Sequence, residues 1–270
     1  MRLTDRTGGF SASGRFAVAD VLAVANQKGG VGKTTSAINL AAAFGAMERR
    51  VLLVDSDPQG NASRGVGWSG RPPTLFDVLS GEASAGEVVV ASGFPYLDLL
   101  PANRDLVGAE FGLQRDADWI RRLASSLEEL DGEYERIFVD CPPALGRLTL
   151  NALFAADAVI VPLQCEYFAL EGISELLATV QRVRELGRPA LEIAGVVLTM
   201  YDDRTNLSRD VAKEVRKHFG SVVCDTIVPR NVRLAEAPSY GMPVLQYDIK
   251  SKGSQAYLGL AHELAGRRPR

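Results

Sequence analysis

Short apolar runs alternate with longer segments of helical periodicity from Val21 to near the end of the chain. The runs are rich in β-branched residues and bounded by polar or glycine-containing segments, which is typical of strands buried on both faces. We expect strands at Val21–Ala25, Val51–Val54, Leu97–Leu100, Arg136–Val139, Ala158–Pro162 and Ile193–Thr199. We expect helices at Lys33–Met47, Ala117–Leu130, Leu170–Leu186, Asn206–Phe219 and Ser254–Ala265. The alternation predicts an α/β fold with a mostly parallel, twisted sheet flanked by helices.

The two ends of the chain differ in composition from this alternating part. Glycine and serine recur among the first 20 residues, and the apolar core of a signal peptide is missing there. We therefore expect a flexible arm at residues 1–20, one folded domain at residues 21–266 and a basic tail at residues 267–270. Within the domain, Gly60–Pro73 is rich in glycine, proline and serine, which indicates a loop.

Overall composition narrows the class of protein. The chain has 270 residues, a net charge of -3 and a pI of about 5.6, so any contact with nucleic acid must come from a local patch. Cys141, Cys165 and Cys224 are too scattered for a disulfide framework, which indicates reduced, mostly buried thiols. No apolar run reaches the roughly 18 residues that a membrane span needs. These observations favour a cytoplasmic protein.

The segment Lys28-Gly-Gly-Val-Gly-Lys-Thr-Thr35 lies between the first expected strand and the first expected helix. Its glycines let the backbone close around an anion, and its amide groups and the helix dipole favour phosphate oxygens. Lys33 supplies a cation to the β and γ phosphates, and the Thr34 hydroxyl is a natural Mg²⁺ ligand. We expect ATP to contact Lys28, Gly29, Gly30, Val31, Gly32, Lys33, Thr34 and Thr35.

The start of this loop departs from the common phosphate-loop pattern. Gln27 stands where a glycine is usual, and Lys28 adds a second lysine. One lysine already serves the nucleotide of its own subunit. On spacing alone Lys28 is either a solvated surface charge or a cation that reaches a phosphate bound to a neighbouring subunit.

Three aspartates follow expected strands, at the edge of the sheet where open α/β folds bind ligands. Asp55 and Asp57 are two residues apart, so both can face the site if the strand geometry continues. Asp140 fits the strand-ending aspartate that binds Mg²⁺ in phosphate-loop enzymes. Because such groups hold the metal or orient an attacking water, Thr34, Asp57 and Asp140 are the metal candidates. The alternative for Asp55 and Asp57 is a turn or capping role before the following proline.

The expected helix Asn206–Phe219 has two faces. A stripe that we expect in the core recurs every fourth residue, at Leu207, Val211, Val215 and Phe219. The opposite face is basic, with Arg209, Lys213, Arg216 and Lys217. Asn206 is expected to cap the start of the helix and Gly220 to end it. The basic face, with other cations in this half of the chain, is either a solvated surface or a patch for DNA phosphates.

Several separated blocks resemble the ParA/Soj family of partition ATPases. The blocks are the phosphate loop, Asp55-Ser-Asp-Pro-Gln-Gly-Asn61, Asp140-Cys-Pro-Pro143, Cys165-Glu-Tyr-Phe-Ala-Leu-Glu-Gly172, Arg204-Thr-Asn-Leu207 and Pro229-Arg-Asn-Val-Arg-Leu-Ala-Glu-Ala-Pro-Ser239. The resemblance runs from Val21 to about Leu264, with the blocks in the order of the family. Arg147 departs from it, since an apolar residue is commoner at that position.

This resemblance implies a single-domain P-loop NTPase that binds ATP and Mg²⁺ and hydrolyses ATP slowly. It implies that Lys28 reaches across an ATP-bound homodimer and that Asp57 orients the attacking water, supported by Asp55. It also implies that Pro229 and Asn231 contact the adenine, although residue type alone favours a turn role for Asn231. The catalytic candidates are Lys28, Lys33 and Asp57. The candidates for non-specific contact with double-stranded DNA are Arg204, Arg216, Lys217, Arg230, Arg233 and Lys250.

We therefore expect an ATP-dependent dimerising switch that binds DNA non-specifically and segregates a chromosome or plasmid with a ParB/Spo0J-like partner. Its expected location is the cytoplasm, in association with the nucleoid. One alternative is a MinD-like membrane-associated positioning ATPase. Tyr257, Leu260, Ala261 and Leu264 form a core stripe, however, and the arginines after them lack bulky apolar neighbours, so a membrane partner is not expected. Another alternative is a non-enzymatic nucleotide sensor, against which Asp57 argues.

Overall fold

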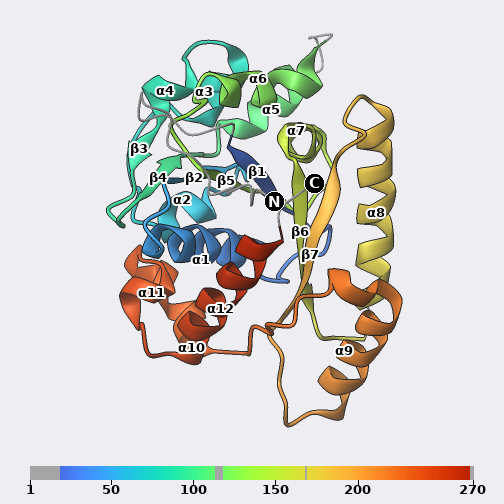
Figure 1. Cartoon of the computed structure of the whole chain (residues 1–270). Coiled ribbons are helices and arrows are strands. Elements are labelled where there is room, and N and C mark those ends of the chain that lie inside the picture. The colour runs from blue at the N-terminus through green and yellow to red at the C-terminus, as the bar shows by residue number, and fades with distance from the viewer. Residues whose placement is uncertain (1–18, 113–117, 168, 268–270) are drawn as a thin grey trace, which may run out of the picture.

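The computed structural model describes residues 19–112, 118–167 and 169–267. Within these ranges a seven-stranded sheet runs through the molecule in the order β3-β4-β2-β5-β1-β6-β7 (Figure 1). The strands are β1 (Asp20–Val24), β2 (Val51–Asp55), β3 (Val90–Ala91), β4 (Leu97–Leu100), β5 (Arg136–Asp140), β6 (Ala158–Gln164) and β7 (Glu192–Thr199). Every neighbouring pair is parallel except β3 and β4.

Helices cover both faces of this sheet (Figure 1). They are α1 (Lys33–Ala46), α2 (Asn61–Gly65), α3 (Leu75–Ser80), α4 (Ala85–Val88), α5 (Leu106–Gly112), α6 (Arg122–Glu128), α7 (Arg147–Ala155), α8 (Ala169–Glu185), α9 (Asn206–Phe219), α10 (Val232–Glu236), α11 (Val244–Tyr247) and α12 (Lys252–Gly266). Successive residues of a strand point to opposite faces. In β2, Leu52 and Val54 therefore pack in one core with α3 to α9, whereas Val51 and Leu53 pack in the other with α1 and α10 to α12. The expected α/β class is confirmed.

Most expected elements are present with small shifts at their ends. β1 begins at Asp20, one residue inside the segment that we assigned to the arm. The helix expected at Ala117–Leu130 starts outside the described residues and is divided into a 3₁₀ turn, Trp119–Arg121, and α6. A loop throughout Gly60–Pro73 is wrong, because α2 begins directly after Gly60, whose φ is 61°. All three cysteines are free and buried.

Helix α9 has the expected bounds but a different buried stripe. Ser208, Ala212 and Val215 are its buried residues, whereas Leu207 is 46% exposed. Our assignment of Leu207 to the core is therefore wrong. The first turns of α9 face the core with Ser208 and Ala212, each one position after the expected Leu207 and Val211. The cap is also shifted, since Thr205 rather than Asn206 accepts from the Ser208 amide at 3.3 Å. Gly220 follows the helix as expected, with a φ of 54°.

Two buried hydrogen bonds fix helix α1 to the C-terminal elements. The Ser36 and Tyr257 hydroxyls are 3.0 Å apart, and both side chains are buried. Asn39 Oδ1 accepts from the Val244 amide at 2.7 Å. Helix α1 is thereby held to α11 and α12, which come from the opposite end of the sequence.

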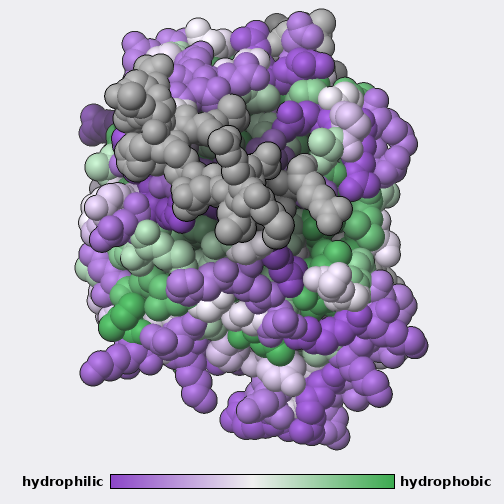
Figure 2. Space-filling view, in the orientation of Figure 1, coloured by the Kyte–Doolittle hydropathy of each residue, from purple (hydrophilic) through white to green (hydrophobic). Residues whose placement is uncertain are grey.

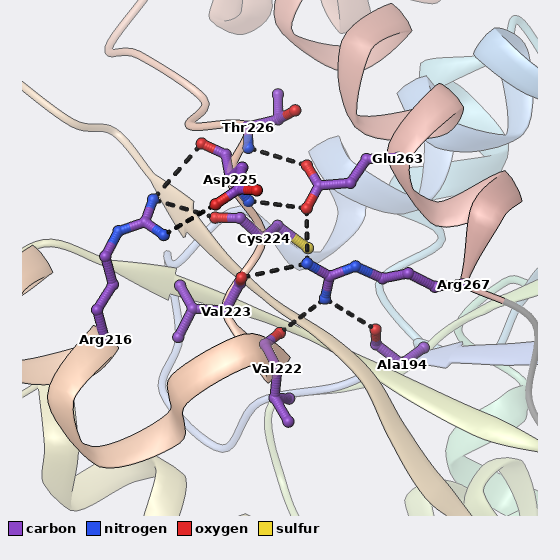
Figure 3. Close-up of polar contacts among 9 residues, drawn as sticks. All are labelled: Ala194, Arg216, Val222, Val223, Cys224, Asp225, Thr226, Glu263 and Arg267. Atoms are coloured by element: carbon purple, nitrogen blue, oxygen red, sulfur yellow. Dashed lines mark hydrogen bonds and ion pairs between the residues drawn. The ribbon is translucent and has the colours of Figure 1, made fainter.

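The end of α12 is clamped to the segment that follows α9. Arg267 donates to three backbone carbonyl oxygens, those of Ala194, Val222 and Val223 (Figure 3). It also pairs with Glu263 at 2.7 Å, and Glu263 accepts from the amides of Asp225 and Thr226. Arg267 therefore belongs to the folded domain rather than to a basic tail, and the arginines after it lie outside the described residues.

The apolar stripe of α12 packs into the core as expected. Tyr257, Leu260, Ala261 and Leu264 are all buried. Exposing this stripe to lipid would require the helix to leave the fold. Within the described ranges, none of the helices combines the length and the apolarity needed to cross a bilayer.

Candidate nucleotide site

The carboxyl ends of three central strands bring the candidate residues to one edge of the sheet. Val24 of β1 is the register partner of Asp140, and Asp140 is also the register partner of Asp55. The phosphate loop follows β1 directly and ends where α1 begins at Lys33. In open α/β folds this edge is where ligands bind. The structure therefore gathers the loop and the strand-ending aspartates in one place.

The phosphate loop has a defined conformation that depends on its glycines and on two polar anchors. Gly30 and Gly32 have φ values of 76° and 89°, which side chains other than glycine rarely adopt. Asn26 Nδ2 donates to the Pro162 carbonyl at 2.8 Å, and Thr199 Oγ1 donates to the Val31 carbonyl at 2.8 Å. The ends of β6 and β7 thereby hold the loop in an open turn with its amides available to an anion.

Lys33 is buried beneath the loop. Its Nζ donates to the Lys28 carbonyl oxygen at 3.0 Å. Burial lowers the pKa of Lys33, and the nearby carboxylates of Asp140 and Asp57 act in the opposite direction. The ammonium group therefore lies between the loop and the acidic side chains, where it can exchange a backbone carbonyl for a phosphate oxygen.

Lys28 is bound within its own chain. Its Nζ lies 3.2 Å from Glu166 Oε2, and its side chain is 35% exposed. Its amide donates to Asn26 Oδ1 at 3.0 Å. Lys28 is thus a partly exposed cation with a defined partner, neither freely solvated nor buried.

Asp140 is fully buried at the end of β5. Neither of its oxygens makes a hydrogen bond of good geometry within the described residues. Burial raises its pKa well above the usual range, and neighbouring Asp55 adds to that effect, while Thr34 and Lys33 favour the charged form. Because an unpartnered buried carboxylate is costly, Asp140 and the Thr34 hydroxyl fit a divalent cation. Among the described residues, no group of three or more acidic, histidine or cysteine side chains is placed to hold a metal ion by itself, so Mg²⁺ would take further ligands from phosphate and water.

The two aspartates at the end of β2 and just beyond it differ in their contacts. Asp55 is fully buried and accepts from the Ser63 amide and hydroxyl, both at 2.7 Å, and from the Asp57 amide. Burial raises the pKa of Asp55 to about 6. Asp57 is 7% exposed, and its Oδ1 accepts from the Gln59 amide at 2.9 Å. Each aspartate thus accepts from the amide two residues later, as the turn interpretation predicts. Asp57 Oδ2 makes no hydrogen bond among the described residues, and Asp57 lies near Lys33.

The two adenine candidates lie beyond β7. Pro229 bridges to Tyr201, two residues after the Thr199 that contacts the phosphate loop. Asn231 is the N-cap of α10, and its Oδ1 accepts from the Arg233 amide at 3.0 Å. The structure thus agrees with the turn role of Asn231 and brings Pro229 to the same edge of the sheet as the loop.

Most of the candidate DNA residues are paired with acidic side chains. Arg204 forms two contacts with Asp202, at 2.8 and 2.6 Å, and remains 82% exposed. Arg233 pairs with Glu236 and Asp248. Arg216 contacts the Cys224 carbonyl and Asp225 (Figure 3). Lys217 pairs with Glu214. The remaining candidates, Arg230 and Lys250, are exposed. Hydrophilic residues cover most of the lower part of the visible face, around α9 (Figure 2). This surface is a set of ion pairs interspersed with exposed cations.

Arg147 packs against α5 and the 3₁₀ turn that precedes α6. Its guanidinium donates to the Glu110 carbonyl at 3.4 Å and lies 5.8 Å from the centre of the Trp119 ring. These contacts join α7 to α5 and to the 3₁₀ turn before α6. The departure from the family pattern therefore serves packing between helices.

Sequence reasoning missed several residues that build this site. Glu166, Ser63 and Thr199 contact Lys28, Asp55 and the phosphate loop, respectively. Thr199 carried a usable signal, because it is a polar residue at the end of a buried strand, level with other site residues. Glu166 lies in a block that resembles the family and Ser63 lies two residues after one, but spacing gave no indication of their partners.

The chain matches one family model and several known proteins over most of its length. A family model described as an AAA domain matches residues 19–193. The chain is 56% identical over 251 residues to the chromosome partitioning protein ParA of Caulobacter vibrioides, which covers 92% of this chain and 94% of that protein. It is 47% identical over 247 residues to the sporulation initiation inhibitor protein Soj of Bacillus subtilis, covering 91% and 98%.

A solved structure resembles the whole fold. It is described as cobyrinic acid a,c-diamide synthase from Mycobacterium smegmatis with a bound ATP analogue and magnesium. Its TM-score is 0.82 at 40% sequence identity, and the match covers 92% of this chain and 95% of that one. In that protein, a fold that matches this one over most of its length holds an ATP analogue and magnesium.

Proposed function

Because the chain belongs to the ParA/Soj family of chromosome-partitioning ATPases, we propose that it is an ATP-driven dimerising switch that binds DNA non-specifically. Hydrolysis of ATP would then drive the segregation of a chromosome or plasmid. The proposal rests above all on one observation: the loop at residues 28–35 is formed next to Asp140, a buried carboxylate whose oxygens make no hydrogen bond of good geometry among the described residues.

ATP is the nucleotide, held by the phosphate loop. The amides of residues 29–35 face the phosphates, and Lys33 moves from the Lys28 carbonyl to the β and γ oxygens. Thr34 and Asp140 would hold Mg²⁺, and Asp57 would contribute through a water molecule. When bound, magnesium neutralises charge on the β and γ phosphates. Asp57 orients the attacking water with its free oxygen.

Lys28 crosses to the nucleotide of a second subunit in the ATP-bound dimer. For that, it must leave Glu166 of its own chain. The ion pair therefore competes with dimerisation. A partly exposed pair of this kind contributes at most about 1 kcal/mol, or about fivefold in an equilibrium constant.

Replacing Glu166 by glutamine is expected to strengthen ATP-dependent dimerisation by about two- to fivefold for each lysine released. Sedimentation velocity at fixed ionic strength measures the change. Glu175→Gln alters an exposed glutamate of α8 in the same way and serves as the control. Weaker dimerisation in Glu166→Gln would instead assign this carboxylate to the assembled dimer.

DNA binding follows from the position of the basic residues relative to the nucleotide. Arg204 follows the end of β7, and Arg233 follows the bridge between Tyr201 and Pro229, so both lie towards the edge that holds ATP. Contacts of this kind to phosphates are independent of sequence and sensitive to salt. Phosphates would have to replace Asp202 and Glu236 as partners of these arginines.

Reversing Arg204 and Arg233 to glutamate is expected to weaken retention on double-stranded DNA about tenfold or more, because phosphate contacts are lost and repulsion is added. ATP affinity should stay the same. The measurement is co-sedimentation with DNA at several salt concentrations, with ATP present. Arg49→Glu is a matched control, since Arg49 is also exposed and paired, with Glu135, but precedes β2 at the opposite edge of the sheet. Unchanged retention in the double variant would remove these arginines from the interface.

A ParB/Spo0J-like protein is the proposed partner that stimulates hydrolysis, and the nucleoid is the proposed location. ATP turnover of the full chain, with and without DNA and with the ParB-like protein of the same organism, tests the whole cycle. Turnover that responds to neither addition would contradict the partition role.

A further inference from the structure

Ser63 is a completely buried serine in α2, and its polar groups connect three segments of the chain. Its amide and its hydroxyl both donate to Asp55 Oδ2 at 2.7 Å. The hydroxyl oxygen also accepts from the Ala102 amide at 3.0 Å. Ser63 therefore joins the end of β2, helix α2 and the segment that follows β4.

The contact between Asp55 and Ser63 closes a short loop, and Asp57 lies inside it. The Asp57 amide donates to Asp55 Oδ1 at 3.2 Å. The Asp57 carbonyl accepts from the Gly60 amide at 2.8 Å, and its Oδ1 accepts from the Gln59 amide. Oδ1 of Asp55 thus holds the Asp57 amide inside the loop, and Oδ2 holds Ser63 at its far end. The orientation of Asp57 depends on that closure.

The surroundings leave little freedom for an alternative arrangement. An added Cβ at Gly60 would lie 2.8 Å from the Ala102 carbonyl oxygen, so the loop packs directly against the segment that Ser63 binds. Asp55 is fully buried and receives two of its three hydrogen bonds from Ser63. Without the Ser63 hydroxyl, Asp55 loses one donor and the Ala102 amide loses its acceptor, so the loop has to rearrange.

We propose that Ser63 is a positioning residue for ATP hydrolysis, whose hydroxyl orients Asp57 through Asp55. The inference rests on the proposed role of Asp57 in orienting water. A displacement of about 1 Å in a group that positions a reactant can lower a rate about 100-fold. Binding of ATP depends on the loop at residues 28–35, and the hydrogen bonds of the Ser63 side chain go to Asp55 and Ala102, outside that loop. Loss of the hydroxyl therefore lowers kcat and leaves the affinity for ATP unchanged.

The test compares Ser63→Ala with Ser254→Ala in the full-length protein. Ser254 is a matched control, because its side chain is also fully buried and its hydroxyl lies within hydrogen-bonding distance of two carbonyl oxygens, those of Val244 and Asp248, in a different part of the fold. We expect kcat to fall roughly 10- to 100-fold in Ser63→Ala, with the Kd for ATP within about twofold and the ATP-dependent dimer retained. Ser254→Ala should lower the melting temperature and leave kcat unchanged. Ser63→Thr keeps the hydroxyl and is expected to recover most of the turnover.

Two outcomes overturn the inference. One is a kcat in Ser63→Ala equal to that of Ser254→Ala, and the other is a loss of ATP affinity as large as the loss of kcat. If Ser63→Ala does not fold, Ser63→Cys, with a weak donor of similar size, is measured in its place with the same expected direction. Asp57→Ala, measured in parallel, distinguishes the role of Asp57 from that of Ser63. Unchanged turnover there overturns the role of Asp57 and this inference with it, whereas a loss in Asp57→Ala without a loss in Ser63→Ala overturns only the inference.

Discussion

Replacing Lys33 by alanine is expected to lower the affinity for ATP about 100-fold, equivalent to about 3 kcal/mol. The variant loses the cation for the β and γ phosphates. It also leaves Asp140 and Asp57, which lie close to the ammonium group, without that positive charge. Repulsion between these carboxylates and the phosphates adds to the loss. Titration of the isolated protein with a fluorescent ATP analogue measures the effect.

Lys28→Ala is the matched control for this prediction. The two lysines are neighbours in the structure, since Lys33 Nζ donates to the backbone carbonyl oxygen of Lys28. If only Lys33 serves the nucleotide of its own subunit, Lys28→Ala should bind ATP with nearly normal affinity and fail to dimerise. Equal losses of ATP affinity in the two variants would contradict the division of roles between them.

Replacing Asp57 by alanine is expected to lower ATP turnover about 100-fold or more, the lower range for a residue that assists proton transfer or positions a nucleophile. Nucleotide binding should persist, because Asp57 is not part of the loop at residues 28–35. The variant should therefore accumulate as an ATP-bound dimer that stays on DNA. Phosphate release and sedimentation of the same sample measure both effects.

Asp57→Asn refines this second prediction. The amide preserves the size of the side chain and can still accept from the Gln59 amide, as Oδ1 of the carboxylate does. Turnover should nevertheless stay low, because the group that faces the site has lost its charge. Normal turnover in Asp57→Asn would reduce Asp57 to a structural member of the loop, and normal turnover in Asp57→Ala would remove it from the mechanism.

Local sequence patterns predicted the parts of the molecule that depend on local chemistry. The strands are recognisable because apolar residues suit burial on both faces, and the phosphate loop because a run of glycines stands between a strand and a helix. Two of these glycines, Gly30 and Gly32, have positive φ values. The edge shared by Asp55 and Asp140 follows from parallel strand order alone. The fold and the location of the site were therefore accessible from the sequence.

The partners of individual side chains were not accessible in this way. Lys28 and Glu166 are 138 positions apart, and no periodicity relates them. Arg216 fits a basic helical face in the sequence, yet its guanidinium contacts the Cys224 carbonyl and Asp225 in the structure. Leu207 fits an apolar stripe, but the packing of α9 leaves it exposed. Each of these outcomes is decided by tertiary contacts, which override local preference.

The attachment of α1 to the C-terminal elements has a consequence for synthesis of the protein. The hydrogen bonds of Ser36 with Tyr257 and of Asn39 with Val244 join positions 221 and 205 residues apart. The phosphate loop therefore leaves the ribosome early, while the groups that complete its supporting helix emerge last. A chain that ends before Lys252 would lack α12 and would leave exposed the apolar residues of α1 that pack against it. Exposed apolar surface of this kind makes incomplete chains prone to aggregation until the last residues emerge.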